Sequence, residues 1–205
     1  MKIIFFYGIL DMKFYACSVK LMKIGYMGIE GSFSQEAAIA MERNAELIPL
    51  VNAQNVVDAL NKGEIDLGVL AESNSTAGEV KETKNALNNI DYSIVKKYDL
   101  AIHHCVYIKQ NKDLKDIEAI ASHEQALNQT IKNRQKLFEG IKIIEVEDTA
   151  LAAKNLFEGI LNENTTIICS KVAGQIFQLK LIYENIEDKK DNITHFIMIR
   201  RNANG

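Results

Sequence analysis

The sequence contains no tryptophan, one proline and three cysteines among its 205 residues. Cys17, Cys105 and Cys169 are widely spaced, odd in number, and form no Cys-x-x-Cys pair. This pattern argues against a disulfide framework and against a structural zinc site. We therefore expect the thiols to behave as small buried apolar groups in a reducing cytoplasm.

Long apolar runs and an excess of positive charge are also missing. No run approaches the roughly 20 apolar residues of a membrane span, which excludes a transmembrane protein. The formal net charge is −3, and since residues 1–21 carry +2, residues 22–205 carry −5. This balance argues against nucleic acid or an anionic membrane as a partner, although a local basic site could hold an anionic metabolite. With 47% apolar and 25% charged residues, the composition indicates a folded globular protein of one or two domains.

The first 21 residues differ from the rest, because they contain five of the chain's 15 aromatic residues. Lys2 and the apolar residues 3–10 suggest a signal peptide, but Asp11 interrupts the run and no small-residue cleavage site follows directly. The other interpretations are an extra strand or helix, and a non-native or upstream extension of a chain that starts at Met22. We favour the extension and expect its deletion to leave folding and ligand binding intact.

Strand-like and helix-like segments alternate from Lys23 onward. Apolar and β-branched runs predict strands over residues 23–28, 46–51, 65–70, 93–109, 119–122, 142–146, 165–169, 181–186 and 193–199. Periodic segments with capping residues predict helices over residues 32–43, 53–61, 80–88, 125–138, 149–157 and 171–179, and residues 72–79 form a polar loop. This alternation predicts an α/β fold with mainly parallel sheets.

Two segments are candidates for crossings between separate sheets. The extended residues 93–109 are long enough to pass from one sheet to another, and the charged residues 187–191 lie near a return crossing. Two lobes joined in this way enclose a cleft, and such clefts are common ligand sites.

Two polar clusters follow predicted strands early in the chain, where α/β proteins place active sites. Residues 28–34 offer two glycines and the hydroxyls of Ser32 and Ser34 at a helix N-terminus, which is either an anion seat or an ordinary capped turn. The Gly-x-Gly-x-x-Gly fingerprint of dinucleotide sites is absent. Residues 73–78 offer small polar side chains that can bind a hydroxyl or carboxylate, or only satisfy a loop.

Two further clusters lie in the second half. Residues 122–129 place His123 just before a predicted helix, and residues 192–196 form the start of the last strand. Thr194 and Phe196 share one face of that strand, and His195 lies on the other.

The adjacent residues His103 and His104 would face opposite sides of a strand. No other metal-ligating residues occur at suitable spacing nearby, so we do not expect a metal site there.

Taken together and in order, these segments resemble the prephenate dehydratase family over about residues 22–201. The segments that carry the resemblance are Gly-Ile-Glu-Gly-Ser-Phe (28–33), Gly-Val-Leu-Ala-Glu-Ser-Asn-Ser-Thr-Ala-Gly-Glu-Val (68–80), Ile-His-His-Cys (102–105), Ser-His-Glu-Gln-Ala-Leu-Asn-Gln (122–129), Thr-Ala-Leu-Ala-Ala (149–153) and Asn-Ile-Thr-His-Phe (192–196). The resemblance implies two α/β lobes of mixed or parallel sheets with flanking helices, a type II periplasmic-binding-protein-like topology and an active site in the cleft. We expect one lobe over about residues 22–98 and 190–205, and the other over about 99–189.

The resemblance also implies a cytoplasmic enzyme of phenylalanine biosynthesis that converts prephenate to phenylpyruvate with loss of water and carbon dioxide. The implied enzyme needs no metal or organic cofactor, and arogenate is a second candidate substrate. The only macromolecular partner we consider is a second copy of the chain, in a homodimer. Thr194 is implied to assist the leaving hydroxyl. The residues implied to bind substrate are Ser32, Asn74, Ser75, Thr76, His123, Gln125, Ala126, Thr149, His195 and Phe196.

The chain departs from the family pattern at three positions. His195 replaces an arginine, Ser73 a glutamate and Glu124 a proline, and Glu72 stands one position before Ser73. The changes at positions 195 and 124 remove positive charge or add negative charge near an anion site. Two alternatives therefore stay open, a relative that decarboxylates prephenate without aromatising it and a two-lobed binding protein without catalysis. The family's C-terminal ACT regulatory domain has no room before residue 205, so we expect no phenylalanine feedback within this polypeptide.

Overall fold

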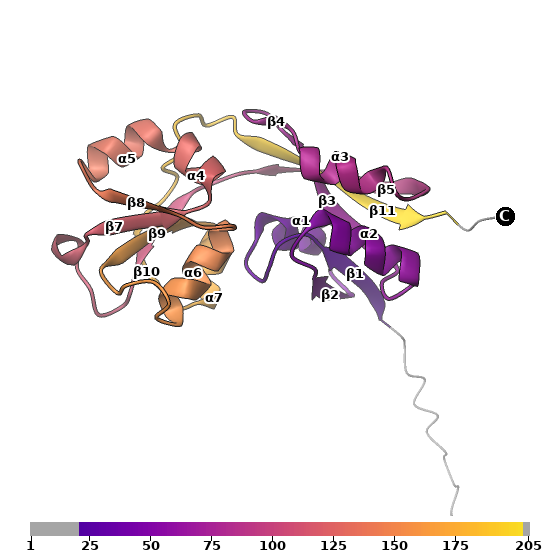
Figure 1. The fold of residues 1–205 in the computed structure, drawn as a ribbon, viewed down its shortest axis with the longest axis horizontal. Coiled ribbons are helices and arrows are strands. Elements are labelled where there is room, and N and C mark those ends of the chain that lie inside the picture. Colours follow the sequence, from indigo (N-terminus) through magenta and orange to yellow (C-terminus); the bar gives the residue numbers. More distant parts are fainter. Residues whose placement is uncertain (1–20, 203–205) are drawn as a thin grey trace, which may run out of the picture.

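The computed structural model describes residues 21–202, and the predictions made for residues 1–20 lie outside this part. Two α/β lobes lie side by side and are connected by two crossings of the chain (Figure 1). Each lobe is built on its own mixed sheet with helices packed on both faces. No helix of the described residues is long and apolar enough to cross a membrane.

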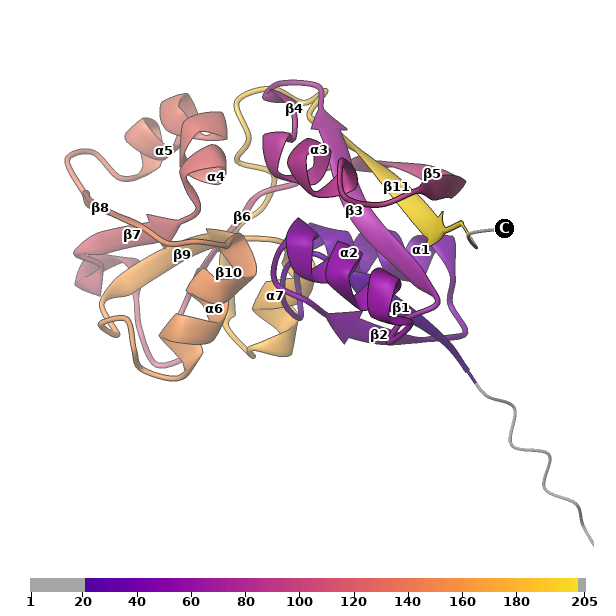
Figure 2. The same cartoon turned by 45° about the vertical axis from the view of Figure 1, so that its right-hand side comes forward.

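The first lobe contains six strands and three helices. Its strands are β1 (Met22–Tyr26), β2 (Ala45–Pro49), β3 (Leu67–Asn74), β4 (Gly78–Glu79), β5 (Tyr92–Ala101) and β11 (Ile193–Arg201), and its helices are α1 (Phe33–Met41), α2 (Ala53–Lys62) and α3 (Lys81–Leu87). The sheet order is β2-β1-β3-β11-β5, and β4 pairs only with β3. β1 to β3 are parallel, whereas β11 runs antiparallel between β3 and β5 (Figure 2).

The second lobe contains five strands, four α-helices and the short 3-10 helix Leu114–Asp116. Its strands are β6 (Cys105–Ile108), β7 (Ala119–Ser122), β8 (Lys142–Glu145), β9 (Thr165–Cys169) and β10 (Lys180–Tyr183), and its helices are α4 (Glu124–Gln129), α5 (Ile131–Leu137), α6 (Thr149–Phe157) and α7 (Lys171–Ile176). The sheet order is β10-β6-β9-β7-β8. β6 arrives from the first lobe and runs antiparallel beside β9, as β11 arrives from the second lobe and runs antiparallel beside β3. This arrangement confirms the expected two-lobed, periplasmic-binding-protein-like α/β fold. The alternation of strands and helices predicted mainly parallel sheets, but both sheets are mixed, because the strands next to the crossings, β5, β6 and β11, pair antiparallel.

Helix α2 shows how the local sequence builds the first lobe. The side chain of Asn52 accepts a hydrogen bond from the backbone N–H of Asn55 over 2.8 Å, and Gly63 ends the helix with a φ of 70°. Val56 and Leu60 are buried against the sheet, where they help form the apolar core. The predicted helix over 53–61 is confirmed to within one residue.

The structure corrects three sequence predictions. The predicted polar loop over residues 72–79 is instead the end of β3, a turn and β4, because β11 and β4 pair with its polar residues. The predicted helix over 125–138 is two helices broken at Thr130, whose hydroxyl donates to the carbonyl of Ala126 over 2.8 Å. The extended residues 93–109 are two strands, β5 and β6, with the first crossing between them.

Strand β3 contains a bulge where it pairs with β11. Asn74 lies opposite Thr194, and Ala71 lies opposite Phe196. On β3 two residues, Glu72 and Ser73, lie between Ala71 and Asn74, whereas on β11 only His195 lies between Thr194 and Phe196. The pairing register of the two strands therefore shifts at this point. Ala71 and Asn74 consequently face the same side of the sheet, which a regular strand would not allow.

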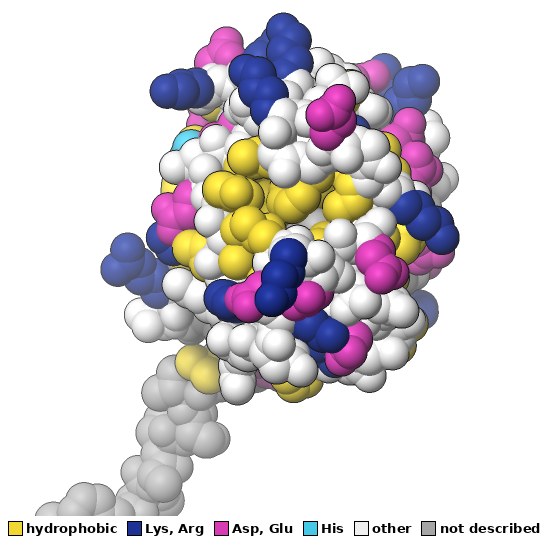
Figure 3. All heavy atoms as spheres, turned by 90° about the vertical axis from the view of Figure 1, so that its left-hand side faces the viewer, with side chains coloured by type: hydrophobic (Ala, Val, Ile, Leu, Met, Phe, Trp, Pro, Cys, Tyr) yellow, Lys and Arg dark blue, Asp and Glu magenta, His cyan; other side chains and the backbone are white. Residues whose placement is uncertain are grey.

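The end of the second lobe that points away from the first carries a gathered set of exposed apolar side chains (Figure 3). Exposed apolar residues of this lobe include Leu137, Ile143 and Ile160. Ile143 lies on β8, an edge strand of the second sheet. This surface is remote from the space between the lobes.

Candidate active site

A cavity of about 330 Å³ lies between the two lobes. Residues from both lobes line it, and those singled out in the sequence are Ser32, Asn74, His123, Gln125, Ala126, Thr149, Thr194 and Phe196. Segments more than 100 residues apart in the chain therefore meet around one space. The predicted site residues Ser75, Thr76 and His195 do not line this cavity.

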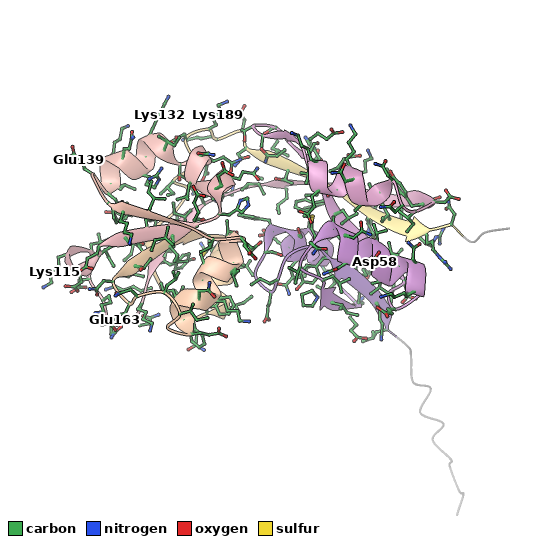
Figure 4. The ribbon with its side chains drawn as sticks, viewed as in Figure 1. Asp58, Lys115, Lys132, Glu139, Glu163 and Lys189 are labelled. Atoms are coloured by element: carbon green, nitrogen blue, oxygen red, sulfur yellow. The ribbon has the colours of Figure 1, made fainter. Side chains whose placement is uncertain are left out.

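A second pocket of about 730 Å³ adjoins this cavity and shares His123, Gln125 and Gln129 with it. Its wall also includes Lys132 and Lys189, whose side chains point outward from the molecule (Figure 4). The smaller cavity is the candidate active site, because that space brings the buried polar groups of both lobes together.

Thr194 and Asn74 form the polar centre of the first-lobe wall. Both side chains are buried, with exposed fractions of 9% and 4%. The Nδ2 of Asn74 donates to the Oγ1 of Thr194 over 2.9 Å and to the Oδ1 of Asn192 over 2.8 Å. Since the Thr194 oxygen already accepts a hydrogen bond, its own hydrogen is free to point into the cavity.

The turn after Asn74 holds the amide of that residue in one orientation. The Oδ1 of Asn74 accepts hydrogen bonds from the backbone N–H groups of Thr76 and Ala77, each over 3.0 Å, and from the hydroxyl of Thr76 over 2.7 Å. Ser75 points elsewhere, since its hydroxyl donates to the carbonyl of Asp191 over 2.8 Å. Thr76 and Ser75 thus support the site without lining the cavity.

Gln129, which was not among the predicted site residues, connects the two lobes. Its Nε2 donates to the hydroxyl of Thr76 over 2.8 Å, and its Oε1 accepts from the Nδ2 of Asn192 over 2.9 Å. The same Oε1 lies 2.8 Å from the Nε2 of His104. The signal was present in the sequence, because Gln129 is the last residue of the segment 122–129.

His104 is a buried, neutral imidazole beside the cavity. Burial lowers its pKa, with the hydrogen bond to Gln129 opposing that effect. Since Gln129 offers an oxygen, we assign the ring hydrogen to the Nε2 of His104. The Nδ1 is buried and has no hydrogen-bond partner in the described part of the chain.

The buried carboxylate of Glu187 ties the two crossings together. One oxygen lies 2.8 Å from the Nδ1 of His103, and the other accepts from the backbone N–H of His104 over 2.9 Å. The two histidines lie in the first crossing and not in a strand, which corrects the sequence prediction. Glu187 lies in the second crossing, and nothing in its local sequence predicted this contact.

The loop between β1 and α1 brings the lobes close together. Gly28 and Gly31 have φ values of 93° and 87°, conformations that favour glycine. A Cβ on Gly31 would lie 2.8 Å from the Cα of Ala173 in the second lobe, and the Ser170 hydroxyl donates to the carbonyl of Gly31 over 2.7 Å. Ser32 then caps α1, with its Oγ accepting from the backbone N–H of Gln35 over 3.3 Å.

Asp148 caps the facing helix α6 from the second lobe. Its Oδ1 accepts from the backbone N–H groups of Ala150 and Leu151 over 2.7 and 3.1 Å. Burial raises the pKa of this carboxyl, and those two hydrogen bonds oppose the rise. Asp148 was missed by the sequence analysis, although it directly precedes the segment 149–153.

His195 does not lie in the cavity, contrary to the prediction that it binds substrate. Alternation along β11 turns it away from the face that carries Thr194 and Phe196. Its Nδ1 lies 2.6 Å from the Oδ1 of Asp99, its neighbour on β5, at an exposed position.

The other departures from the family pattern are also outside the cavity. Glu72 pairs with Lys97 at 3.5 Å between half-exposed side chains, and Glu124 lines the adjoining pocket. Among residues 21–202, no group of three or more His, Cys, Asp or Glu side chains is arranged to hold a metal ion.

A family model described as "Prephenate dehydratase" matches residues 24–204. The arogenate dehydratase/prephenate dehydratase 2 of Arabidopsis thaliana is 30% identical over 180 residues, which are 88% of this chain and 46% of that protein. The bifunctional chorismate mutase/prephenate dehydratase of Pseudomonas aeruginosa is 30% identical over 87% of this chain and 48% of that protein. The chain thus spans about half the length of these relatives.

Solved structures agree with this picture at the level of the fold. The prephenate dehydratase of Arthrobacter aurescens, solved in complex with L-Phe, superposes with a TM-score of 0.80 at 20% identity, covering 89% of this chain and 61% of that one. A structure described as GqqA, a novel type of quorum quenching acylase, superposes with a TM-score of 0.78 at 24% identity over 89% and 65% of the two chains.

Proposed function

Since the chain belongs to the prephenate dehydratase family, we propose that it catalyses the decarboxylating dehydration of prephenate to phenylpyruvate, or of its amino analogue arogenate to phenylalanine. The observation that carries this proposal is the buried pair of Asn74 and Thr194, in which the Thr194 hydroxyl lines the cavity while its oxygen accepts from Asn74. Such a group suits a reaction that must expel a hydroxyl.

The reaction breaks two bonds of the substrate ring. The ring carboxylate leaves as carbon dioxide, and the electron pair of that bond moves through the diene and expels the hydroxyl at the opposite carbon. The hydroxyl takes up one proton and leaves as water, while the ring becomes aromatic. The protein has to hold the carboxylates and stabilise the departing oxygen.

Thr194 is the group we propose to act on that oxygen. An alcohol has no useful acidity at neutral pH, so the hydroxyl donates a hydrogen bond as negative charge develops, and the proton comes from solvent. Asn74 positions it, because the amide donates to the Thr194 oxygen and leaves the hydroxyl hydrogen for the substrate.

The N-terminus of α1 is the proposed seat for a substrate carboxylate. The backbone N–H groups at the start of a helix lack intrahelical partners and attract anions, and Phe33 and Ser34 lie there on the cavity wall. The Ser32 hydroxyl adds a donor, since its oxygen already accepts from Gln35. Phe196 supplies an apolar surface for the ring.

The test is to incubate the purified chain with each substrate and to identify the products. Phenylpyruvate or phenylalanine, formed above the acid-catalysed background, supports the proposal. A non-aromatic dihydro product would identify the decarboxylating alternative. Thermal stabilisation by substrate without any product would identify a binding protein.

A further inference from the structure

The wall of the candidate active site contains acids and no permanent cation. Glu82, Glu147 and Asp148 line the cavity, and within residues 21–202 neither lysine nor arginine does. Prephenate brings two carboxylates and no cation into this space. Arogenate differs by carrying an ammonium group where prephenate has a keto oxygen, so it adds one positive charge at one atom.

The acids are not equivalent, because Asp148 is the least exposed of them. Glu82 and Glu147 are exposed, whereas Asp148 is half-buried. Both hydrogen bonds that Asp148 receives in the structure go to its Oδ1. Its Oδ2 lies 3.8 Å from the point where a Cβ on Gly28 would stand, and the Oγ of Ser32 lies 2.7 Å from the same point.

Two helix N-termini of opposite character therefore lie at the same cavity. The N-terminus of α1 is capped by the neutral Ser32 and attracts a carboxylate. The N-terminus of α6 is already occupied by the Asp148 carboxylate, which repels a second anion and attracts a cation. This arrangement complements the amino-acid end of arogenate, which carries a carboxylate and an ammonium on one carbon.

We propose that Asp148 makes the site selective for arogenate over prephenate by accepting a hydrogen bond from the substrate ammonium at its Oδ2. This inference rests on the proposed function, since it concerns the substrate of the same cavity. The bonds broken are those described above, and the products become phenylalanine, carbon dioxide and water. The keto oxygen of prephenate offers no donor and leaves this half-buried carboxylate without a hydrogen bond from the substrate.

The decisive measurement is kcat/KM for both substrates in the wild type and in Asp148→Asn. The amide preserves the shape and the oxygen that caps α6 but removes the charge. We expect the wild type to prefer arogenate, and the variant to lose roughly 30-fold of that preference, measured as the ratio of the two kcat/KM values. Asp58→Asn is the matched control, since Asp58 lies on α2 outside the cavity (Figure 4), and it should alter neither value.

A second measurement tests the role of Asp148 by ligand binding alone, without any turnover. L-phenylalanine and phenylpyruvate differ in the same ammonium and keto groups and are stable, so calorimetry can compare their binding. Tighter binding of phenylalanine that Asp148→Asn abolishes supports the role of Asp148 even in a chain that turns over neither substrate. A wild type that prefers prephenate, or a preference that Asp148→Asn leaves unchanged, overturns the inference while the dehydratase proposal stands.

Discussion

The hydroxyl oxygen of Thr194 accepts a hydrogen bond from the side chain of Asn74, its direct partner across the β3–β11 ladder, over 2.9 Å. We expect Thr194→Ala to lower kcat by about 100-fold or more, because the donor to the leaving oxygen is lost. Thr194→Ser keeps the hydroxyl and should retain most of the activity. Equal loss in both variants, with normal thermal unfolding, would contradict a role for the hydroxyl.

Substitution of His195 provides the complementary prediction. Because this side chain pairs with Asp99 on the exposed face, His195→Arg should leave kcat/KM within about twofold of the wild type. An arginine there can still pair with Asp99. Steady-state kinetics with prephenate and arogenate would check this, and a large change in KM would show that position 195 reaches the substrate after all.

Removal of the Glu187 carboxylate should loosen the connection between the lobes. Glu187→Ala leaves the backbone N–H of His104 without its acceptor, so the free energy of unfolding should fall by about 2–3 kcal/mol. Hydrogen exchange should accelerate at the amides of His104 and Ile186, which lie in opposite crossings. Glu184→Ala is the control, since the exposed Glu184–Lys171 pair contributes little. Unchanged hydrogen exchange in Glu187→Ala would show that Glu187 does not hold the two crossings together.

The stability of the protein should depend on the ionisation of Asp148. Burial raises the pKa of this carboxyl in the folded state. Above that pKa the carboxyl is ionised in both states, and the ionised form lowers the free energy of unfolding. The cost disappears as the pH falls below the pKa of the unfolded chain, about 4. Asp148→Asn should therefore raise Tm by about 2 °C at pH 7, and the difference should shrink as the pH falls. Thermal unfolding across this range would test it; a variant that melts below the wild type at every pH would contradict it.

Much of the fold follows from short-range patterns in the sequence. The capped helix between Asn52 and Gly63 and the strand at Thr165–Cys169 combine local signals of period and capping, which the final structure keeps. The end of β3 was misread, because Ser73 and Asn74 look like loop residues until β11 and β4 pair with them. Pairing of this kind depends on a strand more than 100 residues away.

The candidate site shows the same division. Thr194, Asn74 and Ser32 were predicted from the resemblance and line one cavity. Asp148 and Glu187 were not, since the first resembles an ordinary helix cap and the second an exposed charge in a loop. Their significance depends on the burial and on the contacts that the two lobes create, which no local pattern encodes.

The bulge in β3 absorbs one residue of chain length without changing which side chains reach the cavity. Ala71 and Asn74 are three positions apart, and both still face the cavity because the bulge takes up the extra residue Glu72. Deleting Glu72 would leave the two residues two positions apart in a regular ladder, where they again share one face of the sheet. Evolution can thus vary or remove this position while Asn74 keeps its place opposite Thr194.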